Sequence, residues 1–127
     1  MKVSFTVPGP VRPKERPRVR RDGHAYTPDR TRSYEAHVKA CCMSAVYGPG
    51  WGWTLDGEYR VDIVVHAPSG VRADLDNCAK SLLDAMQGVA YRNDRQVVHL
   101  SILRTADGEH GADVTVECLS VPERRKR

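Results

Sequence analysis

The feature that most constrains the fold is the stretch GEYRVDIVVHA at residues 57–67, because its side chains alternate along the chain. Three of the four residues at positions 60, 62, 64 and 66 are polar or charged, and apolar residues occupy the positions between them. This alternation is typical of a strand with one face in a hydrophobic core and the other toward solvent. The sequence therefore predicts a strand here. The side chains that it turns toward the core are Tyr59, Val61, Ile63 and Val65.

A helix is predicted directly after this strand, beyond a loop that contains Pro68, Ser69 and Gly70. It runs from about residue 74 to residue 87, and Gly88 supplies a residue that commonly ends helices. At about 100° per residue the apolar side chains gather on one side, which we expect to pack on the sheet. They are Leu75, Ala79, Leu82, Leu83 and Met86.

The remaining elements follow from the same patterns of alternation and helical spacing. Residues 2–7, 96–104 and 113–119 read as strands, and a helix begins at Thr27 or Thr31 and ends before Gly48. The link TADGEHGA between the last two strands predicts an antiparallel hairpin. The order β-α-β-α-β-β predicts an α+β fold with a mixed sheet packed by two helices. We expect a single domain over residues 1–120 and a basic tail at 121–127.

The composition argues against a membrane protein and against a zinc protein. No run of about 18 apolar residues is present, and the start, MKVSFTVPGP, lacks the apolar stretch of a signal peptide. We therefore expect a cytoplasmic protein without a membrane partner or a nucleotide cofactor. No two cysteines show the C-x-x-C spacing of a zinc site, so we expect reduced thiols at Cys41, Cys42, Cys78 and Cys118.

Positive charge is concentrated at residues 11–21, VRPKERPRVRR, in a chain of net charge +4. Such a cluster is typical of a surface that binds a polyanion, most often nucleic acid. Alternating arginines in an extended segment would face phosphates as a row, and Asp22-Gly23 predicts a tight turn and a hairpin. For the basic end ERRKR we favour a solvated or disordered tail. The side chains that we expect to bind DNA are Lys14, Arg16, Arg18, Arg20, Arg21 and Arg72.

Two aspartates stand at the start of the second helix, in RADLDNCAKSLLDAM, and they permit two interpretations. In the first, Asp74 caps the helix, Asp76 interacts favourably with the helix dipole, and Lys80 pairs with acidic residues one turn away. In the second, the carboxylates bind Mg²⁺, which prefers hard oxygen ligands. The next carboxylate for such a site is Asp94, if the chain returns there to the start of the helix. Taken alone, the helix favours the first interpretation.

The motifs together resemble the RusA family of Holliday junction resolvases, which phages and prophages often encode. RADLDNCAKSLLDAM and YRNDRQVVHL carry the family's D-L-D-N, a lysine four residues after the second aspartate, an Asp-Ala pair, and an aspartate before Q-V-V. The motifs PKERPR and YTP resemble one branch of the family, so the similarity spans nearly the whole chain. One departure is Ala73 before the first aspartate, where some members carry arginine.

The resemblance implies a crossover junction endodeoxyribonuclease that depends on Mg²⁺ and acts as a homodimer on four-way DNA, by paired symmetric nicks in recombination and repair. It implies that the catalytic metal ligands are Asp74, Asp76 and Asp94, with Lys80 as a further catalytic residue. A fixed positive charge at Lys80 suits a scissile phosphate. Asp84 also matches a family residue, and we interpret it as a structural partner of Lys80.

Two other functions stay open at this point: a DNA-binding module without catalysis, and a nuclease that also cuts forks and flaps. The intact carboxylates argue against the module, because clustered carboxylates repel DNA unless a cation lies between them. Trp51 and Trp53 are candidates for stacking on an exposed base or for local hydrophobic packing, which we favour. His66, at the end of its strand, is a candidate general base, although we favour no catalytic role for it.

Overall fold

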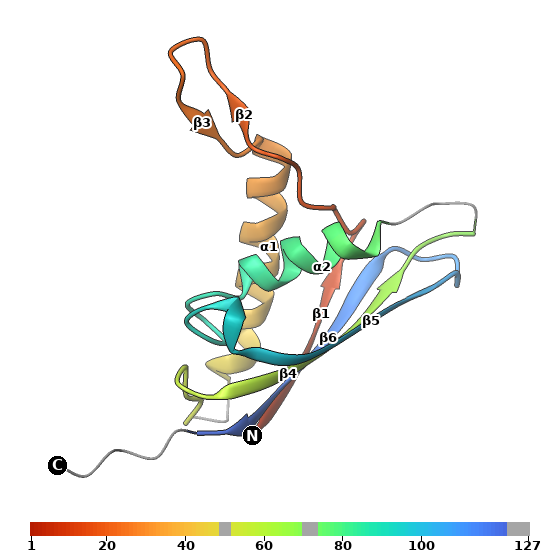
Figure 1. Ribbon diagram of the computed structural model, residues 1–127. Helices are drawn as coiled ribbons and strands as arrows, with labels where there is room; N and C mark the ends of the chain where they lie inside the picture. Colours follow the sequence, from red (N-terminus) through yellow and green to blue (C-terminus); the bar gives the residue numbers. More distant parts are fainter. Residues whose placement is uncertain (49–51, 70–73, 122–127) are drawn as a thin grey trace, which may run out of the picture.

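The computed structural model describes residues 1–48, 52–69 and 74–121. Figure 1 shows α1 and α2 on one side of a curved sheet and a thin hairpin that stands out from the body. The order of the elements confirms the predicted β-α-β-α-β-β arrangement and the α+β class, with the small hairpin and a single helical turn added. The elements are β1 (Lys2–Pro8), β2 (Arg18–Val19), β3 (Ala25–Tyr26), α1 (Asp29–Val46), β4 (Glu58–His66), α2 (Leu75–Ala85), η1 (Asp94–Gln96), β5 (Val97–Thr105) and β6 (Gly111–Ser120).

The main sheet has four strands in the order β1-β6-β4-β5. β4 pairs in parallel with β5 and antiparallel with β6, so the sheet is mixed, as predicted. The predicted hairpin of the last two strands is wrong, because β4 lies between them. The link after β5 crosses the end of β4, where His66 pairs with Thr105 on one side and with Gly111 on the other. A short link requires only that the two strand ends lie near each other. Because neighbouring strands are only about 4.8 Å apart, a third strand fits between them.

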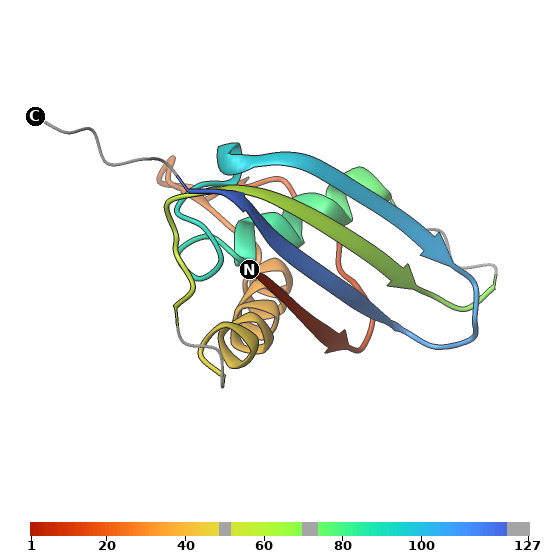
Figure 2. The same cartoon turned by 90° about the horizontal axis from the view of Figure 1, so that it is seen from below.

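Both helices cover the same face of the sheet, and the other face is open (Figure 2). α1 lies against β1, and α2 lies against β5. All four apolar side chains of β4 that the sequence assigned to the core are buried. They meet Val38 and Cys42 of α1 and Leu82 of α2 in one continuous core. No helix in the described part of the chain has the length and apolar character needed to cross a membrane.

Trp53 is partly buried and packs against the core. Its ring stacks on Tyr59 with 5.9 Å between the ring centroids, and its indole N–H donates a 2.7 Å hydrogen bond to the carbonyl of Ala90. A third ring, Tyr91, lies 5.8 Å from Tyr59. This cluster confirms the packing role that the sequence favoured for Trp53, whereas Trp51 lies outside the described residues.

Candidate functional site

Asp74 forms the N-cap of α2. Its Oδ2 accepts a 2.7 Å hydrogen bond from Nδ2 of Asn77, and its Oδ1 accepts a longer one, 3.4 Å, from the Asn77 backbone N–H. The capping role predicted for Asp74 is therefore confirmed. Each carboxylate oxygen keeps a further lone pair, so capping and metal binding are compatible.

The same carboxylate lines a pocket of about 380 Å³ between the N-terminal segment and the end of β4. Arg12, His66, Cys78 and His110 also line this pocket. Burial, with a smaller effect from the charge of Asp74, raises the pKa of Cys78 to about 11, so this thiol is protonated at neutral pH. The carboxylate is thus the group in this pocket that suits a hard cation such as Mg²⁺.

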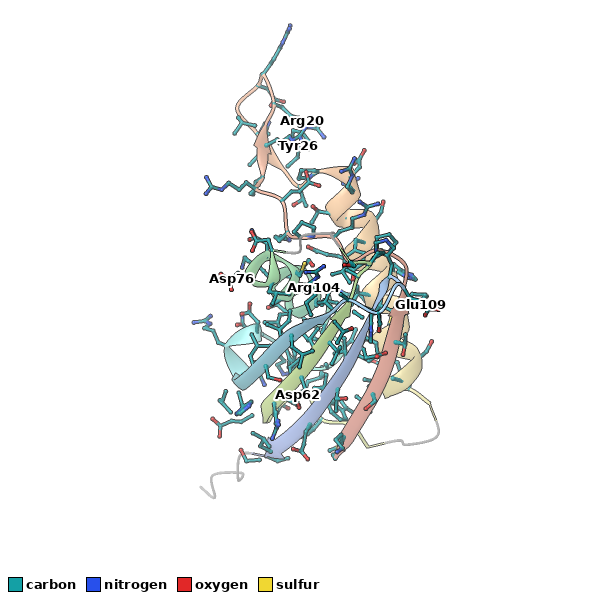
Figure 3. The ribbon with its side chains drawn as sticks, turned by 90° about the vertical axis from the view of Figure 1, so that its right-hand side faces the viewer. Arg20, Tyr26, Asp62, Asp76, Arg104 and Glu109 are labelled. Atoms are coloured by element: carbon teal, nitrogen blue, oxygen red, sulfur yellow. The ribbon has the colours of Figure 1, made fainter. Side chains whose placement is uncertain are left out.

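Asp76 and Lys80 lie one helical turn apart, and both are exposed. Figure 3 shows Asp76 pointing outward on the side of the molecule where β5 forms the edge of the sheet. Lys80 Nζ lies 4.0 Å from Asp84 Oδ2, and its side chain is 58% exposed. Both charged groups can therefore meet a ligand that arrives from solvent.

Asp94 opens η1, the helical turn that precedes β5. Asn93 caps this turn by accepting a 2.9 Å hydrogen bond from the Arg95 N–H, and the Gln96 side chain accepts one of 2.9 Å from the Asn93 N–H. The Asp94 N–H donates to Oε1 of Gln87 at 3.2 Å. Because Gln87 directly follows the C-terminal end of α2, these contacts hold Asp94 at that end of the helix.

The three predicted metal ligands therefore lie at opposite ends of α2 within one chain (Figure 1). The helix has 11 residues and is about 16 Å long, too far for one ion to bridge. In agreement, the described residues contain no group of three or more His, Cys, Asp or Glu side chains that could hold a metal ion. The donors suit Mg²⁺ chemically, but a single chain does not bring Asp94 to Asp74 and Asp76. Metal binding by these residues stays a prediction.

Lys14 lies in an ion triad between the two helices, away from the protruding hairpin. Its ammonium contacts Glu35 of α1 and lies 3.3 Å from Asp84 Oδ2 of α2. Partial burial by itself would lower the pKa of Lys14, but hydrogen bonds to Glu35 and Asp84 and their charges raise it above its ordinary value. The Lys14 backbone N–H also donates to the Asn77 carbonyl at 2.8 Å. Lys14 therefore ties the N-terminal segment to the body, and its contact with DNA stays a prediction.

The hairpin predicted around Asp22-Gly23 is present as β2 and β3. Gly23 has a φ of +88°, which favours glycine, and its N–H donates to the Arg20 carbonyl at 2.9 Å. The guanidinium of Arg20 lies 5.0 Å from the ring centre of Tyr26, and Figure 3 shows both residues on the hairpin. Because β2 has only two residues, the paired part of the hairpin is too short for the long row of arginines that an extended segment would present. The other exposed arginines here are Arg16, Arg18 and Arg21.

His66 is the centre of a charged trio that the sequence did not predict. Its Nδ1 lies 2.6 Å from Asp107 Oδ2, and its Nε2 lies 2.7 Å from Asp113 Oδ2. Hydrogen bonds to Asp113 and Asp107 raise the pKa of His66. An imidazole with both nitrogens engaged by carboxylates has no free nitrogen to take a proton from a substrate or a water, which supports the non-catalytic role favoured for it. The trio joins a strand end, a link and another strand, and no spacing in the sequence could signal it.

A family model matches most of the chain. The model, described as endodeoxyribonuclease RusA, covers residues 8–117, and all the predicted site residues fall within this range. The chain belongs to the RusA family. The resemblance found from the motifs is therefore confirmed, and with it the general function of the family, a DNA endonuclease active on Holliday junctions. A search of curated proteins returned no match.

Besides Trp51, three features of the sequence lie outside what the structure describes. Arg72, a predicted DNA-binding residue, and Ala73, the departure from some RusA members, lie in the segment 70–73. The tail from residue 122 onward is also outside the described part. The roles of Arg72 and of the tail, and the domain boundary at residue 120, stay predictions.

Proposed function

We propose that this RusA-family protein is a Mg²⁺-dependent endonuclease that resolves Holliday junctions by paired symmetric nicks, as a homodimer, in DNA recombination and repair. The observation that carries the proposal is the exposed pair of carboxylates at the start of α2, Asp74 and Asp76, in a chain of this family. Lys80, one turn beyond Asp76, adds a positive charge to the same helix. The arginine-rich hairpin of the same chain offers a surface to DNA phosphates.

Hydrolysis of a phosphodiester needs a nucleophile at neutral pH and compensation of the negative charge at the scissile phosphate. A bound Mg²⁺ supplies an acidified water and polarises a phosphate oxygen. In this chain Asp74 and Asp76 would hold the ion as hard oxygen ligands, and Asn77 orients Asp74 through its 2.7 Å hydrogen bond. The ammonium of Lys80 stabilises negative charge at the phosphate or the leaving oxygen.

The hairpin suits an enzyme that recognises the shape of DNA. Contacts of arginines with phosphates position a protein on DNA and carry no information about base sequence. A four-way junction has approximate two-fold symmetry, and its resolution takes one cut in each of two strands. A two-fold homodimer provides two active sites with matching symmetry.

Cutting of an immobile four-way junction tests the proposal, with linear duplex, fork and flap substrates beside it. We expect the wild-type protein to cut the junction on two opposed strands, and only when Mg²⁺ is present. Asp76→Asn should abolish cutting but leave junction binding intact or tighter, because it removes a negative charge next to DNA. Asp29→Asn is the matched control, since it removes an exposed aspartate from the first turn of the other helix, and it should cut at the wild-type rate.

The same experiment separates the alternative functions. Tight junction binding without cutting under all Mg²⁺ conditions would contradict the proposal and favour a DNA-binding module. If forks and flaps are cut as fast as the junction, the protein is a broader structure-specific nuclease and not a strict resolvase.

A further inference from the structure

A groove borders the pocket that contains Asp74. It has a volume of about 330 Å³ and lies between the residues that follow β1 and one side of α1. The α1 side chains that line it come from positions 30, 33, 34 and 37, which is the spacing of a single helix face. Pro10 and Arg12 line the groove as well as the Asp74 pocket, so the two hollows meet at this short segment.

The segment between the two hollows is held by both helices. Figure 1 shows it passing beside the N-terminal end of α2 on its way from β1 to β2. The buried Ser81 hydroxyl of α2 donates a 2.7 Å hydrogen bond to the Arg12 carbonyl. On the side of α1, His37 Nε2 donates to the Pro8 carbonyl at 3.1 Å. The exposed side chain of Arg12 therefore projects from a backbone that is fixed in place.

The groove has the charge of an anion site. Among the described residues that line it are two exposed arginines, Arg12 and Arg30, and no aspartate or glutamate. In the described part of the chain, the arginines that form ion pairs are others, namely Arg18, Arg32, Arg60 and Arg92. Both groove guanidiniums thus keep their N–H groups for a ligand. A guanidinium binds a phosphate through two parallel hydrogen bonds, which makes phosphate the anion best suited to this groove.

We propose that Arg12 and Arg30 bind a backbone phosphate of the DNA strand that is cut, and so position the scissile phosphate of that strand at Asp74. Phosphates follow one another about every 3.4 Å along the axis of a duplex strand. Because the groove meets the Asp74 pocket at Arg12, the bound phosphate lies within a few nucleotides of the cleaved bond. The groove sets the position of one strand, whereas the hairpin arginines hold the DNA as a whole. This inference rests on the proposed function for the reaction at Asp74.

Such a contact should affect the rate of cutting more than the affinity for DNA, because a small displacement of the reacting group lowers the rate strongly. At saturating protein, Arg30→Gln should slow single-turnover cutting roughly tenfold, the effect of one charge-assisted hydrogen bond. Its unfolding temperature should not change, since Arg30 is exposed. Arg32→Gln is the matched control, because Arg32 pairs with Asp29 and lies about 200° around α1 from Arg30. It should cut at the wild-type rate.

Junctions with a single methylphosphonate identify the phosphate that the arginines contact. This group replaces one charged phosphate oxygen by a methyl group, and it is placed at successive positions on either side of the cleaved bond. At one position it should slow the wild-type protein, yet slow Arg12→Gln and Arg30→Gln little further, because these variants have already lost the contact. If the arginines act only on the fold, both variants will be as sensitive as the wild type at every position, which would overturn the inference.

Fluorescence anisotropy with the same junctions, without Mg²⁺, gives a readout that does not depend on cutting. The methylphosphonate at the contacted position should weaken binding of the wild type more than binding of Arg30→Gln. If the wild type shows this pattern but cuts no junction at any Mg²⁺ concentration, the proposed function fails and the phosphate site in the groove stands. If the wild type cuts normally while both proteins respond equally at every position, the groove is no phosphate site and the proposed function stands.

Discussion

Two lysines lie beside the same carboxylate, that of Asp84, but they differ in burial and therefore in role. Lys14 and Lys80 lie 3.3 Å and 4.0 Å from Asp84 Oδ2. The Lys14 side chain is 20% exposed and also contacts Glu35, whereas the Lys80 side chain is 58% exposed. Charge interactions strengthen as water is excluded, so the Lys14 triad stabilises the fold and the Lys80 pair contributes little.

Replacing each lysine by methionine separates these tasks. Lys14→Met leaves Glu35 without this cation and Asp84 with only the exposed Lys80, so we expect the free energy of unfolding to fall by roughly 1–3 kcal/mol. Lys80→Met should change it by less than about 0.5 kcal/mol, yet slow junction cutting. Urea unfolding and a cutting assay measure the two effects. Equal stability of both variants would mean that the triad does not hold the N-terminal segment.

Asp74 has two tasks that substitutions can separate. Asparagine caps helices about as well as aspartate, so Asp74→Asn should unfold at the wild-type temperature but lose Mg²⁺-dependent cutting. Asp74→Ala removes the cap as well and should lower the free energy of unfolding by about 1 kcal/mol. Thermal unfolding and junction cutting check both variants. Normal cutting by Asp74→Asn would leave Asp74 as a capping residue alone.

Among the elements, charged side chains are concentrated at two places. One is the β2–β3 hairpin, and the other is where the end of β4 meets the start of β6. The hairpin projects from the body and has exposed arginines, with little burial of its own. The end of β4 instead carries His66 between Asp107 and Asp113, and Thr6 of β1 donates a 2.8 Å hydrogen bond to Asp113. The hairpin arginines are therefore available to a partner, whereas the His66 trio joins elements of the sheet to each other.

The hairpin arginines should set the salt dependence of DNA binding. Replacing Arg16, Arg18 and Arg21 by glutamine should weaken binding to junction and duplex alike. The slope of log affinity against log salt should fall by roughly one for each phosphate that the variant no longer neutralises. Fluorescence anisotropy at several salt concentrations measures this. Arg60→Gln, which removes an arginine paired with Asp62 on the sheet, is the control and should leave the slope unchanged.

The His66 trio should make stability depend on pH. Since the pKa of His66 is raised in the folded state, its contribution is complete below the unfolded value of about 6.5 and is lost as pH rises through the folded pKa. The pKa values of Asp107 and Asp113 are lowered, so their contribution is present above about 3.8 and is lost as pH falls through the folded values. The unfolding temperature should therefore decrease from pH 6 to pH 9.

Calorimetry of two variants over a range of pH tests whether His66 causes this pH dependence of the unfolding temperature. His66→Gln should flatten the decrease above pH 6, whereas His110→Gln, an exposed histidine outside the trio, should retain it. An unchanged profile in His66→Gln would show that other groups cause the pH dependence.

For the whole molecule, the topology leaves β5 at one edge of the sheet with exposed apolar side chains. Leu103→Lys places a charge on this edge, which is a candidate contact surface of the proposed homodimer, and we expect a monomer by light scattering and loss of paired cutting. Leu119→Lys is a close control, because Leu119 is also 49% exposed but lies near the end of β6. It should stay dimeric and active. A Leu103→Lys protein that remains dimeric would contradict an interface along β5.

Features that depend on near neighbours could be predicted from the sequence. The alternation in β4, the apolar side of α2, the Asp74 cap and the turn at Gly23 all follow from periodicity or from residue type at one place. The RusA motifs could also be recognised, since the family preserves their order and spacing. These patterns identified the elements and the candidate ligands.

The relations between distant residues were decided only by the tertiary structure. β4 separates β5 from β6 because it pairs with both, although the short link between them indicated a hairpin. Lys14 meets Glu35 and Asp84, and His66 meets Asp107 and Asp113, across sequence distances that carry no periodic signal. The hydrogen bond from the Asp94 N–H to Gln87 likewise holds Asp94 at the far end of α2 from Asp74. The spacing of residues along the chain determines which face of a helix or strand a side chain occupies. Tertiary packing determines which side chains from other elements lie next to it.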